Sequence, residues 1–309
     1  MNNLSVRKKS VARLIKSKSF YTFLIAVIAV ICYVCEHGFE LPYFPDFESN
    51  GNLAVCYIDV GQGDCTLIKT PSGKHMLIDA GTSDSKYKIT DYLKNNGVSD
   101  IEYCVFTHPH EDHIGSADKV IQEFNVANVL MTQKYEATAV FERLLDALKE
   151  SKATKGTKVL LPTVNETCYI DEDVFFTVFS ADGNNDDTNN SSIVLKLTYD
   201  STDFLFSGDA ESSIEYEILK NNSNVEAEVF KCGHHGSSTS NSEEFVKEVS
   251  PDIAIVSCGV DNSYGHPHRE VVSLMNKIGA DIYRTDIDGD IVLFSDGNTV
   301  NLHSTNKAA

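Results

Sequence analysis

The chain has 309 residues, of which 42% are hydrophobic, so it is long enough to bury a full core in one large domain or two small ones. Its formal net charge is −19, yet the first 35 residues carry six basic groups and no acids. The remainder therefore has 20 Lys and Arg against 45 Asp and Glu, a formal charge of −25. Such an acidic surface opposes nonspecific binding to nucleic acids, which normally needs a basic one.

The N-terminal region joins a basic segment to an uncharged apolar one. Residues 1–19 hold the early basic groups, and residues 20–35, FYTFLIAVIAVICYVC, carry no charge. As a helix this run spans about 24 Å, slightly less than the roughly 30 Å hydrocarbon core of a bilayer. The basic flank predicts a cytoplasmic N-terminus, a single transmembrane helix and an extracytoplasmic C-terminal domain at the cell membrane. A cleaved signal peptide, which would give a secreted protein, is the alternative, and a buried helix of the domain is a third.

Residues 36–52 are rich in Pro, Gly and aromatic side chains and are interpreted as a linker to one domain at 53–305. Apolar runs of strand length occur at residues 53–60, 65–70, 75–80, 101–107, 127–132, 174–180, 192–200, 203–209, 227–233, 252–258, 280–285 and 290–295. Amphipathic helical segments follow at residues 85–96, 116–124, 136–152, from 211, 242–249 and 268–278. Strands followed by helices occur twice along the chain, which predicts a layered α/β fold with two similar halves.

The cysteines and the acidic loop carry no site of their own. The six cysteines beyond the apolar run stand singly, so they are interpreted as small buried side chains rather than as disulfides or a zinc site. The segment ADGNNDDTNNSS, residues 181–192, resembles a calcium loop in composition but lacks the required spacing, and is interpreted as a surface loop.

The strand at 101–107 leads into HPHEDH, which places three histidines and two acids in six positions. Beyond a strand end, His108 and His110 can point the same way, while Asp112 and His113 turn to a second point a few ångströms away. Two imidazoles at one centre and a carboxylate plus an imidazole at the next are two half-complete sites for divalent cations. The segment therefore predicts a dinuclear metal centre whose remaining ligands come from elsewhere.

Other candidate ligands also follow apolar strands. Asp209 ends FLFSGD, and a carboxylate in such a place can bridge two cations roughly 3.5–4 Å apart. The histidine pair His234 and His235 follows a second strand, and His266 and His268 follow a third. No histidine occurs between positions 113 and 234, so any third imidazole must come from these later loops.

The motifs DVGQGD, LIDAG, THPHEDHIGS, FSGDAE, HHGSS and NSYGHPH occur in this order from about residue 53 to 303. The set resembles the metallo-β-lactamase superfamily and, within it, the hydrolase domain of ComEC-type DNA-uptake proteins and its stand-alone relatives. The resemblance implies an αββα sandwich that binds two divalent metal ions. Zinc is the first expectation for the metal, and manganese or iron would also suit His and Asp ligands. Full ComEC-type proteins add a multi-helix channel, which is not expected of a chain with one anchor helix.

The resemblance also implies a division of ligands between two metals. The first would be held by His108, His110 and Asp209, and the second by Asp112, His113 and Asp209. One member of the pair His234–His235, for which we favour His234, would complete the first site. His266 would complete the second, and His235 and His268 are candidates for metal or substrate binding.

Further polar residues lie beside the expected ligands. Asp209 and Asp112 are the expected catalytic residues, because two bridged cations lower the pKa of a shared water that Asp112 can orient. Asp79 is expected to support a ligand histidine and Asp64 to bond a neighbouring loop, with plain turn roles as the alternative.

A second group of polar residues follows the histidine-bearing strands. Ser237, Ser238, Asn262 and Tyr264 would either bind phosphate oxygens or, for the serines, cap the following helices.

The expected function is metal-dependent hydrolysis of a phosphodiester, because two cations stabilise the charge of its transition state. DNA is the substrate that the resemblance implies, although the charge of −25 opposes it. A phosphodiesterase of wall polymers such as teichoic acid is the alternative, with β-lactam hydrolysis less favoured. The non-enzymatic alternative is a metal-stabilised binding module of a surface or DNA-uptake apparatus. Protein partners and oligomeric state carry no signal in the sequence.

Overall fold

The computed structural model describes residues 51–221 and 224–306. In this part of the chain no helix is long and apolar enough to cross a membrane. The predicted cytoplasmic segment, the predicted anchor at residues 20–35 and nearly all of the predicted linker lie outside the described residues. The predicted domain at 53–305 is described throughout except at residues 222 and 223.

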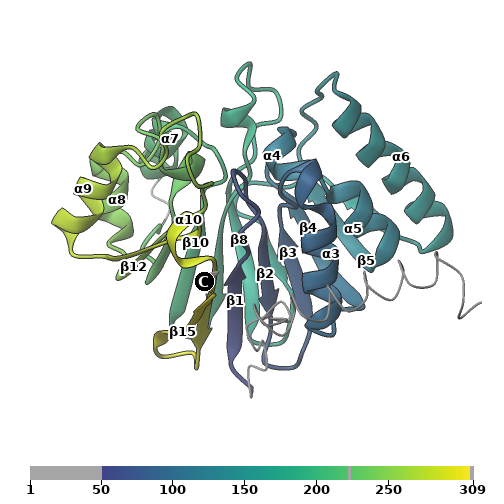
Figure 1. The fold of residues 1–309 in the computed structure, drawn as a ribbon, viewed down its shortest axis with the longest axis horizontal. Coiled ribbons are helices and arrows are strands. Elements are labelled where there is room, and N and C mark those ends of the chain that lie inside the picture. The colour runs from purple at the N-terminus through teal and green to yellow at the C-terminus, as the bar shows by residue number, and fades with distance from the viewer. Residues whose placement is uncertain (1–50, 222–223, 307–309) are drawn as a thin grey trace, which may run out of the picture. The chain divides into compact units, whose positions relative to one another are not determined.

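Two β-sheets form the centre of the domain (Figure 1). The first has eight strands in the order β15-β14-β1-β2-β3-β4-β5-β6. Their bounds are β1 Leu53–Tyr57, β2 Thr66–Lys69, β3 His75–Ile78, β4 Asp100–Phe106, β5 Asn125–Met131, β6 Lys158–Leu160, β14 Asp290–Ser295 and β15 Val300–Asn306. Strands β3 to β6 run parallel to one another, whereas β15, β14, β1, β2 and β3 pair antiparallel.

The second sheet has seven strands in the order β13-β12-β11-β10-β9-β8-β7. Their bounds are β7 Thr167–Tyr169, β8 Val174–Ser180, β9 Val194–Tyr199, β10 Thr202–Phe206, β11 Val229–Lys231, β12 Ile253–Val256 and β13 Asp281–Arg284. Strands β10 to β13 are parallel and β7 to β10 antiparallel, so each sheet has one parallel and one antiparallel half. The carboxyl ends of neighbouring parallel strands meet at one edge of each sheet, and there the loops can bring polar side chains together.

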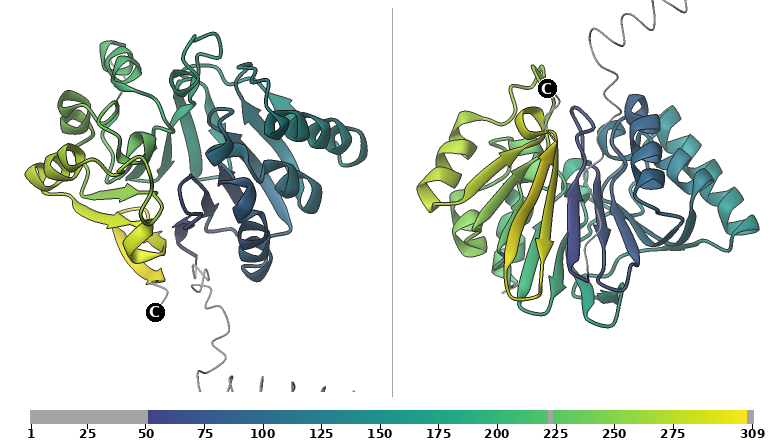
Figure 2. Two further views of the ribbon diagram at one scale, coloured as in Figure 1. Left: turned by 45° about the horizontal axis from the view of Figure 1, so that its top comes forward. Right: turned by 60° about the horizontal axis from the view of Figure 1, so that its bottom comes forward.

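Helices cover the outer face of each sheet, and the right-hand view of Figure 2 shows these helices outside the two facing sheets. The first sheet is covered by α3 Lys86–Asn95, α5 Ala117–Glu123 and α6 Ala139–Thr154. The second is covered by α7 Ser212–Lys220, α8 Glu243–Val249 and α9 Arg269–Ile278. Short helical turns lie in the connections: η1 Ser83–Ser85, α4 Glu111–Ile114, η2 Asn189–Ser191, η3 Gly233–Gly236 and α10 Thr285–Asp288.

Alternation along the strands creates the layers. In β1, Leu53, Val55 and Tyr57 pack into the core between the sheets, whereas Ala54 and Cys56 pack under the helices. This period of two is the geometry of a strand buried on both faces. The predicted α/β architecture of two sheets flanked by helices is therefore confirmed. The six cysteines of the described part are buried and unpaired, as the sequence predicted.

Candidate metal centre

The loop after β4 carries three of the candidate ligand histidines and is fixed by Asp79 at the end of the neighbouring strand β3. The backbone N–H and the hydroxyl of Thr107 both donate to the Asp79 carboxylate at 2.8 Å. The chain then bends at His108 and Pro109 and is extended at His110, which precedes the short helix α4. Helix α4 carries Asp112 and His113, so the H-x-H-x-D-H spacing divides the ligands between a non-helical segment and one helical turn.

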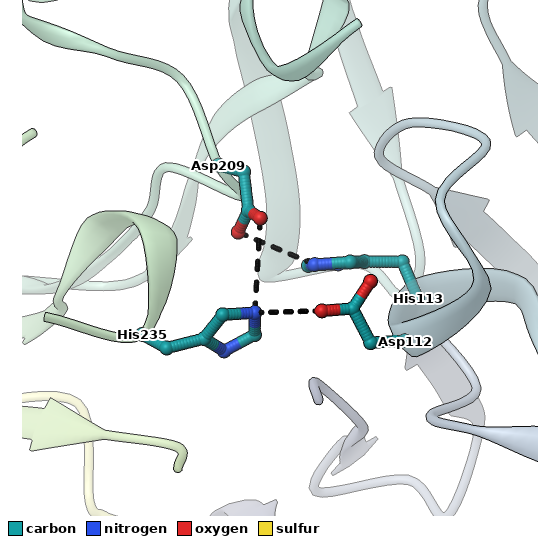
Figure 3. A group of neighbouring side chains, drawn as sticks. All are labelled: Asp112, His113, Asp209 and His235. Carbon is teal, nitrogen blue, oxygen red and sulfur yellow. Dashed lines mark ion pairs between the residues drawn. The ribbon is translucent and has the colours of Figure 1, made fainter. Parts of the chain in front are cut away.

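A compact group of four donors forms where the two halves of the domain meet. Asp112, His113, Asp209 and His235 each offer an atom within 4.8 Å of the others. His113 Nε2 lies 3.2 Å from Asp209 Oδ1, and His235 Nε2 lies 3.2 Å from Asp112 Oδ2 and 3.7 Å from Asp209 Oδ2. Figure 3 shows the four side chains converging. Asp112 and His113 come from α4, Asp209 from the loop after β10, and His235 from the turn η3 after β11. We call this group the second position, because it contains the Asp112–His113 pair.

A smaller group of three donors lies beside it and shares Asp209. His108, His110 and Asp209 also bring their ligand atoms within 4.8 Å of one another. His108 Nε2 lies 2.9 Å from His110 Nδ1 and 3.7 Å from Asp209 Oδ2. We call it the first position. Because one carboxylate belongs to both groups, the geometry matches a pair of adjacent cation sites bridged by Asp209.

Buried carboxylates support the histidines of the second position from behind. Asp79 Oδ2 lies 2.8 Å from His113 Nδ1, and Asp64 Oδ1 lies 3.3 Å from His235 Nδ1, which also contacts the Ser257 carbonyl oxygen at 3.0 Å. The other oxygen of Asp64 accepts a hydrogen bond of 2.8 Å from Lys231 Nζ, which is itself buried. A carboxylate on the far nitrogen of a ligand histidine fixes its orientation and increases its basicity.

The GQGD motif brings Asp64 to this place. A Cβ at Gly63 would lie only 2.5 Å from the carbonyl oxygen of Asp112, so a side chain there would push the two loops apart. The Asp64 N–H donates to that same carbonyl at 3.0 Å. The glycine therefore allows the Asp64 loop to lie directly against α4.

The two adjacent histidines after β11 lie in unusual backbone conformations. His234 has φ 50° and His235 has φ 54°, which places both in the left-handed region. Non-glycine residues adopt this region rarely, and such conformations concentrate at functional sites. His234 Nε2 lies 3.7 Å from Asp209 Oδ2 and its Nδ1 3.2 Å from Thr239 Oγ1, so the side chain reaches the first position without joining its compact group.

His266 and His268 lie at the rim. His266 lines the same cavity as the two groups, and its ring centroid lies 6.2 Å from that of His235. Compact ligand groups among the described residues include His235 but neither His266 nor His268. His268 Nδ1 instead accepts from the Ser238 backbone N–H at 2.9 Å. The structure thus places His235 where the sequence analysis expected His266, and the assignment of ligands to each metal stays a prediction.

The remaining polar candidates from the sequence analysis lie at the rim of the site. Asn262 accepts from the His266 N–H at 2.9 Å and donates to the carbonyl of the same residue at 2.7 Å, which fixes that loop. The Ser237 hydroxyl contacts Thr239. The next helix, α8, is capped by Ser242 rather than by Ser237 or Ser238. Tyr264 is 66% exposed, and its ring lies 5.6 Å from that of His266 at an interplanar angle of 19°.

The electrostatics of the cluster favour positive charge at the second position. Burial by itself lowers the pKa of His235, but Asp209 and Asp64 raise it to about 10. Burial likewise opposes protonation of His113, yet Asp209 and Asp79 raise its pKa well above the usual value. Burial raises the pKa of Asp112, but the neighbouring histidines lower it to about 2. Carboxylates that stabilise protonated imidazoles in this way also stabilise a divalent cation that replaces the protons.

The first position favours neutral imidazole. Burial and the nearby His113 lower the pKa of His108 well below its usual value. At the rim, outside both groups, burial and then His235 lower the pKa of His266 to about 4. A neutral imidazole is the form that binds a metal, so these rings are ready to do so without releasing a proton.

The unsatisfied atoms of the cluster test whether a cation fits. His113 Nε2, Asp209 Oδ1 and His235 Nε2 are buried and have no hydrogen-bond partner. Buried polar atoms without partners are rare in folded proteins and call for an explanation such as a bound ion. All three atoms belong to the second position, and a divalent cation there would satisfy them together. The residues present therefore fit the metal that the ligand set implies.

A cavity of about 340 Å³ opens over the two groups. Its lining consists of Gln62, His110, Glu111, Asp112, Asn189, Asp209, His234, His235, Tyr264 and His266. This lining contains three carboxylates and no Lys or Arg. A substrate with negative charge would therefore depend on bound cations for its charge balance.

Sequence analysis missed three residues that support this site. Lys231 ends a buried strand three residues before His234. A lysine within such an apolar run needs a buried partner, and this was a signal that the sequence offered. Ser192 accepts from the Asp209 backbone N–H at 3.0 Å and lies 3.2 Å from His108 Nδ1. Asn189 lines the cavity. The last two belong to the segment interpreted as a surface loop, where no spacing pattern distinguished them.

Comparison with known proteins agrees with this geometry. The model of the family described as "Metallo-beta-lactamase superfamily" matches residues 58–260. ComE operon protein 3 of Bacillus subtilis is 29% identical over 86% of this chain and 36% of its own length. Competence protein ComA of Neisseria gonorrhoeae is 27% identical over 80% of the chain and 33% of its own length. The chain thus spans about a third of these curated relatives, which are ComEC-type competence proteins.

Solved structures show the same fold at low sequence identity. The diiron β-hydroxylase CmlA of Streptomyces venezuelae aligns with a TM-score of 0.53 and 14% identity, covering 79% of this chain and 54% of CmlA. Igni18, a metallo hydrolase of Ignicoccus hospitalis, aligns with a TM-score of 0.51 and 14% identity, covering 78% and 98%. The shared fold, the matched family model and the paired donor groups lead to one identification: the chain belongs to the metallo-β-lactamase superfamily.

Proposed function

We propose that this protein is a metal-dependent phosphodiesterase that holds two divalent cations at the first and second positions. The observation that carries the proposal is the sharing of Asp209 by two adjacent donor groups beneath an open cavity. When bound, paired cations lower the pKa of a water, hold it in line with the phosphorus and stabilise the charge of the transition state. Zinc suits the imidazoles and manganese the carboxylates, so both metals are candidates.

The residues of the chain divide the remaining work. Asp209 joins the two positions, because its Oδ1 faces His113 of the second and its Oδ2 faces His108 of the first as well as His235 of the second. Asp112 lines the cavity, where its carboxylate can accept a hydrogen bond from the attacking water and orient it. Tyr264 and Gln62 line the same cavity and can contact the groups on either side of the scissile phosphate.

Two substrate classes have support from different observations. Relatives named for competence support DNA as the substrate. The acidic charge and a cavity lined by no Lys or Arg support a second candidate, a phosphorylcholine ester on a wall polymer of the teichoic-acid type, because its choline group is a cation. We place DNA first, because bound cations at the cavity floor would offset its charge at the point of cleavage.

The sequence of residues 1–35 supports a location of the protein at the cell membrane. The basic segment followed by an uncharged apolar run fits a membrane anchor with an extracytoplasmic domain, with secretion after cleavage as the alternative. Protease added to intact cells should remove the domain from the cell surface. Full protection of the domain in intact cells, with digestion after lysis, would contradict this topology.

The function is tested with the full-length chain purified in detergent and loaded with zinc or manganese. Hydrolysis of bis-p-nitrophenyl phosphate, single-stranded and double-stranded DNA, a phosphorylcholine ester and a β-lactam is measured beside the Asp209→Ala variant. We expect DNA cleavage that the variant lacks. Turnover of only the small diester or of the choline ester would move the assignment to wall polymers. Two bound metals without turnover of any substrate would leave a metal-stabilised binding module.

A further inference from the structure

The two metal positions differ in their number of donors. Asp112, His113, Asp209 and His235 give the second position four, whereas His108, His110 and Asp209 give the first only three. Those groups count only histidine, cysteine and carboxylate side chains, so a neutral oxygen donor would not be among them. A four-coordinate cation held by three side chains has one position left, which a water or a neutral side-chain oxygen close by can fill.

The short turn η2 lies directly against both ligand loops of the first position. Ser192, at its end, contacts His108 Nδ1 at 3.2 Å and accepts from the Asp209 N–H at 3.0 Å. The next residue, Ile193, donates its N–H to the Thr107 carbonyl at 2.9 Å. These contacts fix the turn between the loop that carries two imidazoles and the loop that carries the bridging carboxylate.

Two adjacent asparagines on this turn have different surroundings. The side-chain oxygen of Asn190 accepts from the Glu211 N–H at 3.0 Å, so its role is to hold the loop after Asp209. Asn189 lines the cavity instead, and its side-chain oxygen is buried without any hydrogen-bond partner. Its backbone N–H is already bonded to Asp187 at 2.8 Å, which leaves the amide side chain free to serve the cavity.

We propose that the side-chain oxygen of Asn189 is the fourth protein donor at the first metal position. The proposal rests on the metal-dependent function proposed above and adds that the two positions are chemically unequal. The second position offers two imidazoles with two carboxylates, whereas the first replaces one of these charged donors with a neutral amide oxygen. The first position therefore binds its cation more weakly, and it exchanges metal while the second remains filled.

The rival donor is His234, whose Nε2 lies 3.7 Å from Asp209 Oδ2. Its other ring nitrogen contacts the Thr239 hydroxyl at 3.2 Å, and its side chain is 22% exposed. The His234 side chain is thus in contact with solvent, whereas the Asn189 oxygen is buried and has no hydrogen-bond partner. That difference is why the amide and not the imidazole is assigned to the first position.

The test titrates Co²⁺ into the metal-free full-length protein, followed by calorimetry and by the visible absorption of the bound ion. The wild type should bind two ions with different affinities. Asn189→Ala should weaken only the weaker event, by at least about tenfold, the lower end of the effect of losing even an outer partner of a metal ligand. The absorption of that ion should change, and Asn189→Asp, which keeps an oxygen in place, should restore binding.

A neighbouring residue provides the matched control. Asn184 lies on the same loop, is exposed and bonds only to Gln133 and Asp182, so Asn184→Ala should titrate like the wild type. A titration of Asn189→Ala that matches the wild type would overturn the proposal. This holds even if the KM of the variant for a phosphodiester rises. Loss of the weaker event in His234→Ala but not in Asn189→Ala would assign the donor to the imidazole. Because the titration needs no substrate, an inactive protein that behaves as expected would refute the proposed activity but not this donor.

Discussion

The two metal positions share one carboxylate but are supported in different ways. At the second position, His113 is backed by Asp79 and His235 by Asp64, and both carboxylates are buried. At the first position, His108 Nδ1 faces only hydroxyl groups, those of Ser192 and Thr107, each at 3.2 Å.

This contrast indicates unequal metal binding. A carboxylate behind a ligand imidazole makes the ring more basic and fixes its direction, which a hydroxyl does less strongly. We therefore expect the second position to bind a cation more firmly than the first, and the cation of the first to exchange more readily. Changes to the supports of the second position should remove metal and stability together, whereas changes near the rim should affect only the substrate.

The largest effect is expected from removing an imidazole of the second position. His235→Ala should reduce the bound metal from two ions to one and lower kcat by more than about 100-fold, above the effect of losing an outer partner. His266→Ala is the matched comparison, since His266 lies in the same cavity but outside the compact group. It should keep two ions and lose no more than about tenfold in rate. Bound metal and kcat are measured for both variants. If His266 and not His235 completes this position, His266→Ala will lose one ion and most of its rate, and His235→Ala will lose neither.

A large effect on stability is expected at the support of His235. Lys231→Met leaves the buried Asp64 carboxylate without its cation and should lower the free energy of unfolding by about 3–5 kcal/mol at pH 7. Lys196→Met is the control, because Lys196 is also buried but its partner Asp203, 2.9 Å away, is 24% exposed and can be solvated. Its effect should stay near that of a surface pair, about 1 kcal/mol or less.

The same pair has a defined pH dependence. Burial alone would raise the pKa of Asp64, but Lys231 and His235 hold it well below its usual value. A lowered carboxyl pKa contributes stability that is present above about pH 4 and is lost as the pH falls further. The difference in unfolding free energy between wild type and Lys231→Met should therefore be full where Asp64 is ionised in both proteins, and it should shrink as the pH falls through the pKa of Asp64 in the variant, which the loss of Lys231 raises. A difference that stays constant with pH in denaturant titrations would mean that Asp64 is not the group left unpaired.

Most of the fold could be predicted from local sequence patterns. Long apolar runs and amphipathic segments matched the central strands and the larger helices, because burial on both faces leaves a continuous signal. The strands β6, β7 and β15 were not predicted. Each lies at the edge of a sheet, and two of them have only three residues, so their sequences alternate too briefly or carry too many polar side chains. Pairing with a neighbour, which no local pattern encodes, makes them strands.

The candidate site could be predicted as a set of residues but not as a set of contacts. Strand-end positions marked His108 and His113 after β4 and Asp209 after β10, but these strands belong to different sheets, so the packing of the two sheets brings the three side chains together. Which histidine of the later loops meets Asp112 depends on the left-handed backbone at His234 and His235, which the sequence HHG does not specify. Asn189 was not predicted, because no sequence spacing marks one amide in an acidic loop as a metal ligand.

The smallest effect is expected at the rim. Tyr264 is 66% exposed, and one face of its ring stacks on His266, so the other face is open to a nucleobase. If DNA is the substrate, Tyr264→Ala should raise KM for a single-stranded oligonucleotide about five- to tenfold, from the loss of roughly 1 kcal/mol of base stacking. Its kcat should not change, because no ligand of either position is altered. Tyr264→Phe should restore KM, since stacking needs the ring and not the hydroxyl. Tyr216→Ala, which removes an equally exposed tyrosine from α7, should leave both constants unchanged. A fall in kcat with unchanged KM would mean that Tyr264 orients His266 and does not contact the substrate. The rim residues would then serve the metal positions rather than substrate binding.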